Sequence, residues 1–220
     1  MMILEPVKLG FSMDGLEEGV AGYVKLVSTI FDKPTYVEIG VGHGETLVGV
    51  AQLLSEINED WRAIGIELPN GYSFDKSITK QNATDRRIKL DFMNGVPQEN
   101  IDPPWNQITV VLEFSQVVIG SHWIEPIHLL LIDGCHGKEC ATLDFLCAEP
   151  FIPQGGIVMF HDFGREQVGQ HQPHCGRLDV RGACDDLKLT KDERHGWKYL
   201  CELVGDKTRD GANMGVFQRI

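Results

Sequence analysis

Apolar positions recur along the chain with two periods, and their alternation predicts the fold. Short apolar runs bounded by glycine, proline or polar clusters are typical of strands buried on both faces of a parallel sheet. Between them, apolar residues spaced three and four apart predict helices. The predicted strands occupy residues 35–40, 62–67, 108–114, 128–134, 156–163, 197–205 and 212–220. The predicted helices occupy residues 15–31, 45–60, 138–149 and 178–188.

This order of elements predicts an α/β fold with a doubly wound, mostly parallel seven-stranded sheet that carries helices on both faces. The last two strands are joined by the short polar turn KTRDG. A parallel return needs about a dozen residues, so the C-terminal strand must be antiparallel. Since domains average roughly 150 residues, we expect a single domain over residues 1–220.

The first two predicted helices each have one apolar face that should lie against the sheet. In the first helix this face contains Leu16, Val20, Tyr23, Val24, Val27 and Ile30. In the second helix the residues expected to face inward are Leu47, Val50, Leu53, Leu54 and Ile57.

Two segments do not fit the regular alternation. The 40 residues between Glu67 and Ile108 exceed a normal connection, which predicts an insertion over residues 70–107 that covers or flanks the site. Residues 164–177, GREQVGQHQPHCGR, are polar and follow a strand end, so we interpret them as a substrate lid. Their histidines and cysteine (His171, His174, Cys175) have no fourth zinc ligand at a suitable spacing, which favours a solvated loop.

The composition indicates which binding partners and which cellular compartment to expect. The net charge of −12 and a pI near 5.0 argue against binding to nucleic acid or to an anionic membrane. No apolar run approaches the ~18 residues of a membrane helix, and the first residues lack a signal-peptide pattern. The six cysteines form no CxxC pair, so we expect reduced thiols and a cytoplasmic location.

A glycine turn follows the first predicted strand, in Glu38-Ile-Gly40-Val-Gly42-His-Gly44-Glu-Thr46. A dinucleotide fingerprint would need glycine where Glu45 stands, and a triphosphate loop would need a lysine. The glycine turn is therefore neither a dinucleotide-binding fingerprint nor a triphosphate-binding loop. A carboxylate at the strand end suits a ligand with a cationic group instead.

This spacing resembles motif I of the class I S-adenosylmethionine-dependent methyltransferases. The resemblance implies that Glu38, Thr46 and the glycines Gly40, Gly42 and Gly44 lie against the methionine and ribose part of the cofactor. It also implies that Glu67, at the next strand end, accepts hydrogen bonds from both ribose hydroxyls. A strand–helix turn without any ligand is the competing interpretation of the glycines, and a solvated loop acid that of Glu67.

Two segments compete for the strand whose end borders the adenine in this family. They are RIKLDFMNG and ITVVLEFSQ, and we favour the second because HLLLIDG follows it at the family's usual separation. Glu113 and Ser115 are then expected near the adenine.

The later strands resemble a branch of these methyltransferases that acts on small molecules, including sugars and natural products. The similar stretches are HLLLIDGCHG and PQGGIVMFHDF, which place Asp133, His136, His161 and Asp162 at the ends of two neighbouring strands. Methyl transfer to a hydroxyl needs a general base or a metal to remove the proton. The resemblance implies Asp133, His136 and His161 as catalytic residues, with Asp133 also beside the cofactor.

The same resemblance implies a divalent cation held by Asp133, His161 and Asp162. Carboxylates suit Mg²⁺, whereas a histidine ligand shifts the preference toward Mn²⁺, Fe²⁺ or Zn²⁺. The sugar branch has paired acids where this chain has His161-Asp162, so a metal-free mechanism with His136 or His161 as base stays open beside the metal. A structural hydrogen bond is the competing interpretation of each histidine.

We therefore expect an S-adenosylmethionine-dependent enzyme that O-methylates a small hydroxylated acceptor. The motif of amino-group methylation is absent after the fourth strand, where IDGCHG stands. A binding module that has lost catalysis and a hydrolase with a metal in the Asp133, His136, His161 and Asp162 cluster are the alternatives. The identity of the acceptor and any homo-oligomer stay open at this stage.

Overall fold

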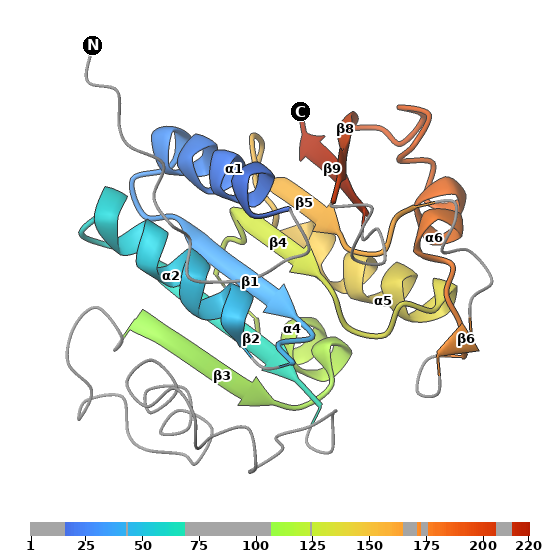
Figure 1. Ribbon diagram of the computed structural model, residues 1–220, viewed down its shortest axis with the longest axis horizontal. Coiled ribbons are helices and arrows are strands. Elements are labelled where there is room, and N and C mark those ends of the chain that lie inside the picture. The colour runs from blue at the N-terminus through green and yellow to red at the C-terminus, as the bar shows by residue number, and fades with distance from the viewer. Residues whose placement is uncertain are drawn as a thin grey trace.

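The computed structural model describes residues 16–42, 44–68, 107–123, 125–164, 171–172, 176–205 and 213–220. A seven-stranded sheet forms the centre of the molecule, in the order β3-β2-β1-β4-β5-β9-β8 (Figure 1). Its strands are β1 (Thr35–Ile39), β2 (Arg62–Glu67), β3 (Ile108–Leu112), β4 (Leu129–Ile132), β5 (Ile157–Phe160), β8 (Trp197–Val204) and β9 (Asn213–Arg219). A separate two-stranded ladder joins β6 (His171–Gln172) to β7 (Gly176–Arg177).

The sheet is parallel except where β9 enters it. Strands β3, β2, β1, β4 and β5 pair in parallel, and β9 pairs antiparallel with both β5 and β8. The predicted doubly wound sheet with an antiparallel C-terminal strand is therefore confirmed.

Helices cover both faces of this sheet. They are α1 (Glu17–Ile30), α2 (Glu45–Ile57), α4 (Ser115–His122), α5 (Lys138–Ala148), the short 3-10 helix η4 (Glu149–Phe151) and α6 (Val180–Asp186). One apolar cluster joins α1 and α2 to one face, and a second joins α4, α5 and α6 to the other. Figure 1 shows α1 and α2 in front of the sheet and α5 behind it.

The unbroken apolar runs are explained by this double coverage. Along β1, Tyr36 belongs to the first cluster and Val37 to the second, and neither side chain is exposed to solvent. All four residues of β4 and of β5 are likewise buried. Because every side chain in these strands meets a helix layer, no polar alternation is required.

The burial predicted for two helix ends is wrong. Ile57 is 40% exposed and Ile30 is 44% exposed, although both lie on the apolar stripe of their helix. Each is the last residue of its helix, and the following residue, Asn58 or Phe31, is extended. The chain turns away there, so the apolar stripe continues one residue beyond its contacts.

The strand beside β2 is Ile108–Leu112, as we predicted from ITVVLEF. The competing segment RIKLDFM and nearly all of the predicted insertion over residues 70–107 lie outside the described residues. In the predicted lid over residues 164–177, the ladder of β6 and β7 was not predicted. The other candidate zinc ligands, His174 and Cys175, lie outside the described ranges.

Two findings concern membrane-spanning helices and the cysteine residues. None of the helices in the described part combines the length and apolar character needed to cross a membrane. Among the described cysteines, Cys140, Cys147, Cys184 and Cys201 are free thiols.

Candidate active site

The glycine turn rests directly on the end of β4. Gly40 has a φ of +87°, a left-handed conformation that favours glycine. A Cβ atom on Gly40 would lie 2.3 Å from the backbone oxygen of Asp133. Backbone therefore touches backbone here, and the turn and Asp133 are held together.

Gly42 is required for a different reason. Its φ is +51°, and a Cβ atom there would meet no atom of the described residues within 4 Å. Its N–H donates to Oε2 of Glu67 at 2.9 Å, while Oε1 of Glu67 accepts from the N–H of Leu68 at 2.8 Å. Gly42 is thus adjacent to a carboxylate whose two oxygens each accept one hydrogen bond from the described residues, and a carboxylate oxygen can accept a second from a ligand hydroxyl.

Glu38 lies inside the protein, one residue before the end of β1. It is 1% exposed, and its Oε2 accepts a 2.8 Å hydrogen bond from the hydroxyl of Tyr36. Burial raises the pKa of Tyr36 well above its ordinary value, and the charges of Glu38 and Asp133 raise it further. Thr46, in the first turn of α2, is also buried. Glu38 and Thr46, both predicted to contact the cofactor, therefore lie beside the glycine turn with their side chains buried.

The end of β3 carries the residues predicted for the adenine. Oε1 of Glu113 accepts from the N–H of Phe114 at 2.8 Å. The hydroxyl of Ser115 donates to Oδ1 of Asp144, and Nε2 of Gln116 donates to the same oxygen at 2.7 Å. Burial raises the pKa of Asp144 to about 6, against the opposing effect of the Ser115 hydrogen bond. Sequence patterns do not predict this network, because a lone acid in a helix is usually solvated.

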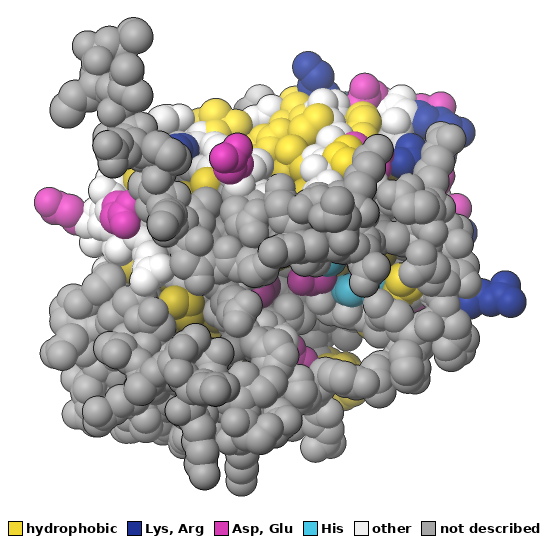
Figure 2. All heavy atoms as spheres, viewed as in Figure 1, with side chains coloured by type: hydrophobic (Ala, Val, Ile, Leu, Met, Phe, Trp, Pro, Cys, Tyr) yellow, Lys and Arg dark blue, Asp and Glu magenta, His cyan; other side chains and the backbone are white. Residues whose placement is uncertain are grey.

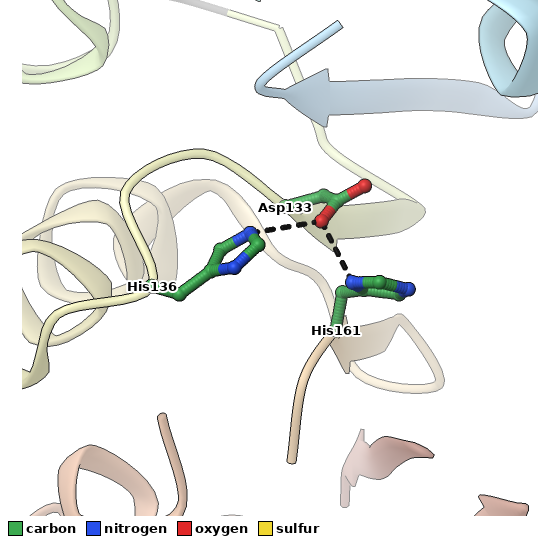
Figure 3. A group of neighbouring side chains, drawn as sticks. All are labelled: Asp133, His136 and His161. Atoms are coloured by element: carbon green, nitrogen blue, oxygen red, sulfur yellow. Dashed lines mark hydrogen bonds and ion pairs between the residues drawn. The ribbon is translucent and has the colours of Figure 1, made fainter. Parts of the chain in front are cut away.

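A cluster of acids and histidines lies at the ends of β4 and β5. Oδ1 of Asp133 is 3.1 Å from Nε2 of His136 and 2.9 Å from Nδ1 of His161 (Figure 3). Asp133 thus lies between the two imidazole rings, which come from the β4–α5 loop and the end of β5. The structure brings together the three residues that we predicted as catalytic.

Asp162 closes the cluster from the other side. Its Oδ2 is 2.6 Å from Nδ1 of His136, and its Oδ1 is 3.5 Å from Nδ1 of His161. Asp162 has a φ of +54°, which is unusual for a residue other than glycine. Such strained conformations cost about 1–3 kcal/mol and are concentrated at functional sites. The backbone is therefore distorted at the point where this carboxylate reaches His136.

The charges in the cluster are strongly coupled. Burial alone would lower the pKa of His136, but Asp133 and Asp162 outweigh it and raise the pKa to about 11. The pKa of His161 is raised in the same way. Burial would raise the pKa values of Asp133 and Asp162, but the histidines hold both below their ordinary value. With no other cation bound, these shifts favour the protonated form of each ring, and a protonated imidazole cannot act as a general base.

The same residues fit a divalent cation. One ligand atom from each of Asp133, His136 and His161 lies within 4.8 Å of the others. The Nδ1 atoms of both histidines are buried near carboxylate oxygens, yet neither makes an aligned hydrogen bond within the described residues. A divalent cation with two neutral imidazoles would carry the same charge as two imidazolium groups. Mixed nitrogen and oxygen donors suit Mn²⁺, Fe²⁺ or Zn²⁺ better than Mg²⁺.

A comparison with protein families agrees with this geometry. A family model described as a methyltransferase domain matches residues 37–163. The match begins inside β1 and ends one residue after Asp162, so it includes the glycine turn, Glu67 and the acid–histidine cluster. No curated protein matches the chain.

Solved structures share the fold at low sequence identity. An O-methyltransferase from Bacillus cereus in complex with SAH has a TM-score of 0.56 and 17% identity, over 94% of this chain and 84% of its own. The O-methyltransferase TomG from Streptomyces achromogenes, with SAM, has a TM-score of 0.57 and 14% identity, over 91% and 79%. A candidate rRNA methylase from Clostridium thermocellum has a TM-score of 0.58 and 14% identity, over 96% and 100%. At these identities the likeness establishes the fold.

Proposed function

The chain belongs to a family of methyltransferase domains, and we propose that it transfers a methyl group from S-adenosylmethionine to a hydroxyl oxygen of a small acceptor. The observation that carries this proposal is the contact between Gly40 and the backbone of Asp133. This contact places the glycine turn, which suits the cofactor, directly beside the acid–histidine cluster, which suits the acceptor. Donor and acceptor would therefore meet at the end of β4.

The cofactor side is supported by the turn and by Glu67. No described residue occupies the space beside Gly42, so a ligand can approach bare backbone there, and Glu67 can accept from two vicinal hydroxyls such as those of a ribose. Two solved O-methyltransferases that share this fold, from Bacillus cereus and Streptomyces achromogenes, contain SAH and SAM respectively. Both facts favour S-adenosylmethionine as the methyl donor.

The acceptor side is supported by the cluster. In the reaction the acceptor oxygen bonds to the methyl carbon while the carbon–sulfur bond breaks, leaving a neutral thioether, and the hydroxyl proton leaves to a base or to solvent. Asp133, His136 and His161 would hold a divalent cation, which supplies a Lewis acid that acidifies the bound hydroxyl. Asp162 would orient His136 through the short Nδ1–Oδ2 contact.

The acceptor is expected to be a small molecule and not a nucleic acid. The net charge of −12 opposes a polyanion. The fold alone does not determine the class of acceptor, because it is shared by O-methyltransferases and by a candidate rRNA methylase.

Calorimetry and a turnover assay test the proposal together. S-adenosylhomocysteine should bind to the purified protein with a stoichiometry near one. With S-adenosylmethionine and a panel of catechols, phenols and sugars, at least one acceptor should yield S-adenosylhomocysteine. Removing metal with a chelator should reduce this turnover, and Mn²⁺ should restore it more fully than Mg²⁺.

Other results would favour the alternatives. Binding of S-adenosylhomocysteine without turnover on any acceptor would favour a binding module. Stoichiometric metal without affinity for the cofactor would favour a hydrolytic metal centre. Full activity after chelation would overturn the metal assignment while leaving methyl transfer intact.

A further inference from the structure

The loop that carries His136 receives a hydrogen bond that the proposed reaction does not explain. The carbonyl oxygen of His136 accepts it from the N–H of Asp179 at 3.0 Å. Asp179 directly precedes α6, and α6 packs against α5 (Figure 1). Gly134 and Gly137 flank the short loop, and glycine leaves the backbone free to adopt many conformations. The bond from Asp179 therefore restricts the backbone at His136.

The side chain of Asp179 is held by the first turn of α6. Its Oδ1 accepts a 3.0 Å hydrogen bond from the N–H of Gly182, which is the arrangement of an N-cap. A Cβ atom on Gly182 would collide with the carboxylate of Asp179, so a larger residue at this position would displace the carboxylate. Asp179 thus binds α6 through its side chain and the loop of His136 through its backbone.

Helix α6 also holds the chain that follows β5. The guanidinium of Arg181 lies 4.7 Å from the centre of the Phe163 ring, which is fully buried. Phe163 comes directly after Asp162. Helix α6 therefore contacts both segments that form the 2.6 Å contact between Nδ1 of His136 and Oδ2 of Asp162.

The position of His136 determines which of its ring nitrogens can bind a metal. Nδ1 lies against Asp162, and Nε2 faces Oδ1 of Asp133 at 3.1 Å (Figure 3). A proton on Nδ1 faces a carboxylate, which leaves the lone pair of Nε2 for a cation. A shift of the backbone at His136 would break this two-sided arrangement and remove one of the three ligands.

We propose that Asp179 is a positioning residue: as the N-cap of α6 it holds the backbone of His136 and thereby keeps Nε2 of His136 available to the metal. This inference rests on the proposed function, because it assumes a divalent cation in the cluster of Asp133, His136 and His161. It assigns a role in metal binding to a residue whose own carboxylate is bound to α6.

The test measures Mn²⁺ binding to the chelator-treated protein by calorimetry, with S-adenosylhomocysteine binding as a second measurement. Asp179→Ala removes the cap and should weaken Mn²⁺ binding at least about tenfold, since groups that orient metal ligands typically contribute this much. Asp179→Asn keeps an oxygen for the cap but loses the charge, so its Mn²⁺ affinity should stay within about threefold of the wild-type value. The affinity for S-adenosylhomocysteine should be that of the wild-type protein in both variants.

Gly182→Ala perturbs the same contact without changing Asp179. Its methyl group displaces the carboxylate, yet alanine favours a helix over glycine by about as much as a lost cap costs. The midpoint of chemical denaturation should therefore stay near the wild-type value. Mn²⁺ affinity should nevertheless fall as in Asp179→Ala, whereas a cap that serves only stability would leave it unchanged.

Asp186→Ala is the matched control, because Asp186 is the last residue of α6 and pairs with Lys138 of α5 at 2.7 Å. It should bind Mn²⁺ as the wild-type protein does. Wild-type Mn²⁺ affinity in Asp179→Ala or Gly182→Ala, or an equal loss in Asp179→Asn or Asp186→Ala, overturns the inference.

The wild-type protein separates this inference from the proposed function. Binding of S-adenosylhomocysteine without binding of Mn²⁺ overturns the metal assignment, and the inference with it. Binding of Mn²⁺ without binding of S-adenosylhomocysteine overturns the proposed methyl transfer and leaves the role of Asp179 to be decided by its variants.

Discussion

Two glycines of one turn are needed for opposite reasons. Gly40 is confined, because any side chain would collide with the backbone of Asp133, whereas a Cβ atom on Gly42 would touch none of the described residues. Glycine at position 40 is thus needed for the fold, and we expect glycine at position 42 to be needed for ligand binding. Substitution at the two positions should separate stability from binding.

Alanine at each position makes this separation measurable. Gly42→Ala should cost about 1–2 kcal/mol of unfolding free energy, from the left-handed backbone alone, yet reduce the affinity for S-adenosylhomocysteine at least about tenfold. Gly40→Ala should destabilise the protein by about 3 kcal/mol or more, because backbone must shift. Chemical denaturation and calorimetry report the two quantities, and equal losses of stability would contradict the distinction.

Asp133 lies between two imidazoles, so its charge matters to the reaction more than to the cofactor. Asp133→Asn should lower kcat by about 10²–10⁴-fold and change the affinity for S-adenosylhomocysteine by less than about threefold. Bound metal, measured by elemental analysis, should fall in parallel. A variant with wild-type turnover would remove Asp133 from the catalytic set.

At the scale of elements, polar side chains connect parts of the chain that are distant in sequence. Nδ1 of His128, one residue before β4, accepts a 2.9 Å hydrogen bond from the N–H of Thr35. Asp144 connects α5 to α4. Folding shifts the pKa of His128 and that of Asp144, and the two shifts should make stability depend on pH in opposite directions.

His128 should destabilise the fold in acid. Burial lowers its pKa below the ordinary 6.5, so the neutral form is favoured when folded. Its contribution is present above pH 6.5 and is lost as the pH falls below that value, where the unfolded chain binds the proton more readily. His128→Asn keeps an acceptor for Thr35 but cannot titrate. The loss of unfolding free energy between about pH 7.5 and 5.5 should be smaller in this variant than in the wild-type protein.

Asp144 should act in the opposite direction. Its pKa rises from 3.8 to about 6 on folding, so the folded state holds the proton more tightly. The contribution of Asp144 to the free energy of unfolding should therefore fall by about 3 kcal/mol as the pH rises from about 4 to about 6. Asp144→Asn should then match the wild-type protein near pH 4 and exceed it by up to that amount near pH 7.5. A difference between the two proteins that does not change with pH would argue against this assignment.

At the scale of the whole molecule, net charge sets the class of partner. With a net charge of −12, we expect no measurable binding of tRNA or duplex DNA at about 10 µM protein and about 0.1 M salt. Fluorescence anisotropy with labelled nucleic acid would detect it. Binding that weakens steeply as salt increases would reveal a local basic surface and reopen nucleic acid as the acceptor.

The elements that could be predicted from the sequence are those fixed by local pattern. The buried runs of β1, β4 and β5 have no polar interruption, because both faces are covered, and the short turn before β9 leaves only an antiparallel return. The glycine spacing was equally visible, because the left-handed conformations at Gly40 and Gly42 require that residue type. Local rules of this kind do not depend on the rest of the chain.

The parts that could not be predicted depend on distant partners. Asp144 precedes Phe145 in a helix of mixed character, and only Ser115 and Gln116 show why it is buried. The pairing of His136 with Asp162 occurs where Asp162 has a left-handed backbone, a conformation that is uncommon for residues other than glycine and cannot be located from local pattern alone. Sequence patterns placed these side chains at the correct edge of the sheet but could not provide their mutual contacts.

The position of β9 also has a consequence for how the chain is made. Residues Asn213–Arg219 are synthesised after β8 but occupy the space between β5 and β8. During translation β5 keeps an open hydrogen-bonding edge, and β8 has no neighbour in the sheet, until β9 emerges from the ribosome. Unpaired edges of this kind are where nascent chains aggregate or recruit chaperones. Completion of the sheet is therefore one late event that joins β5, β9 and β8.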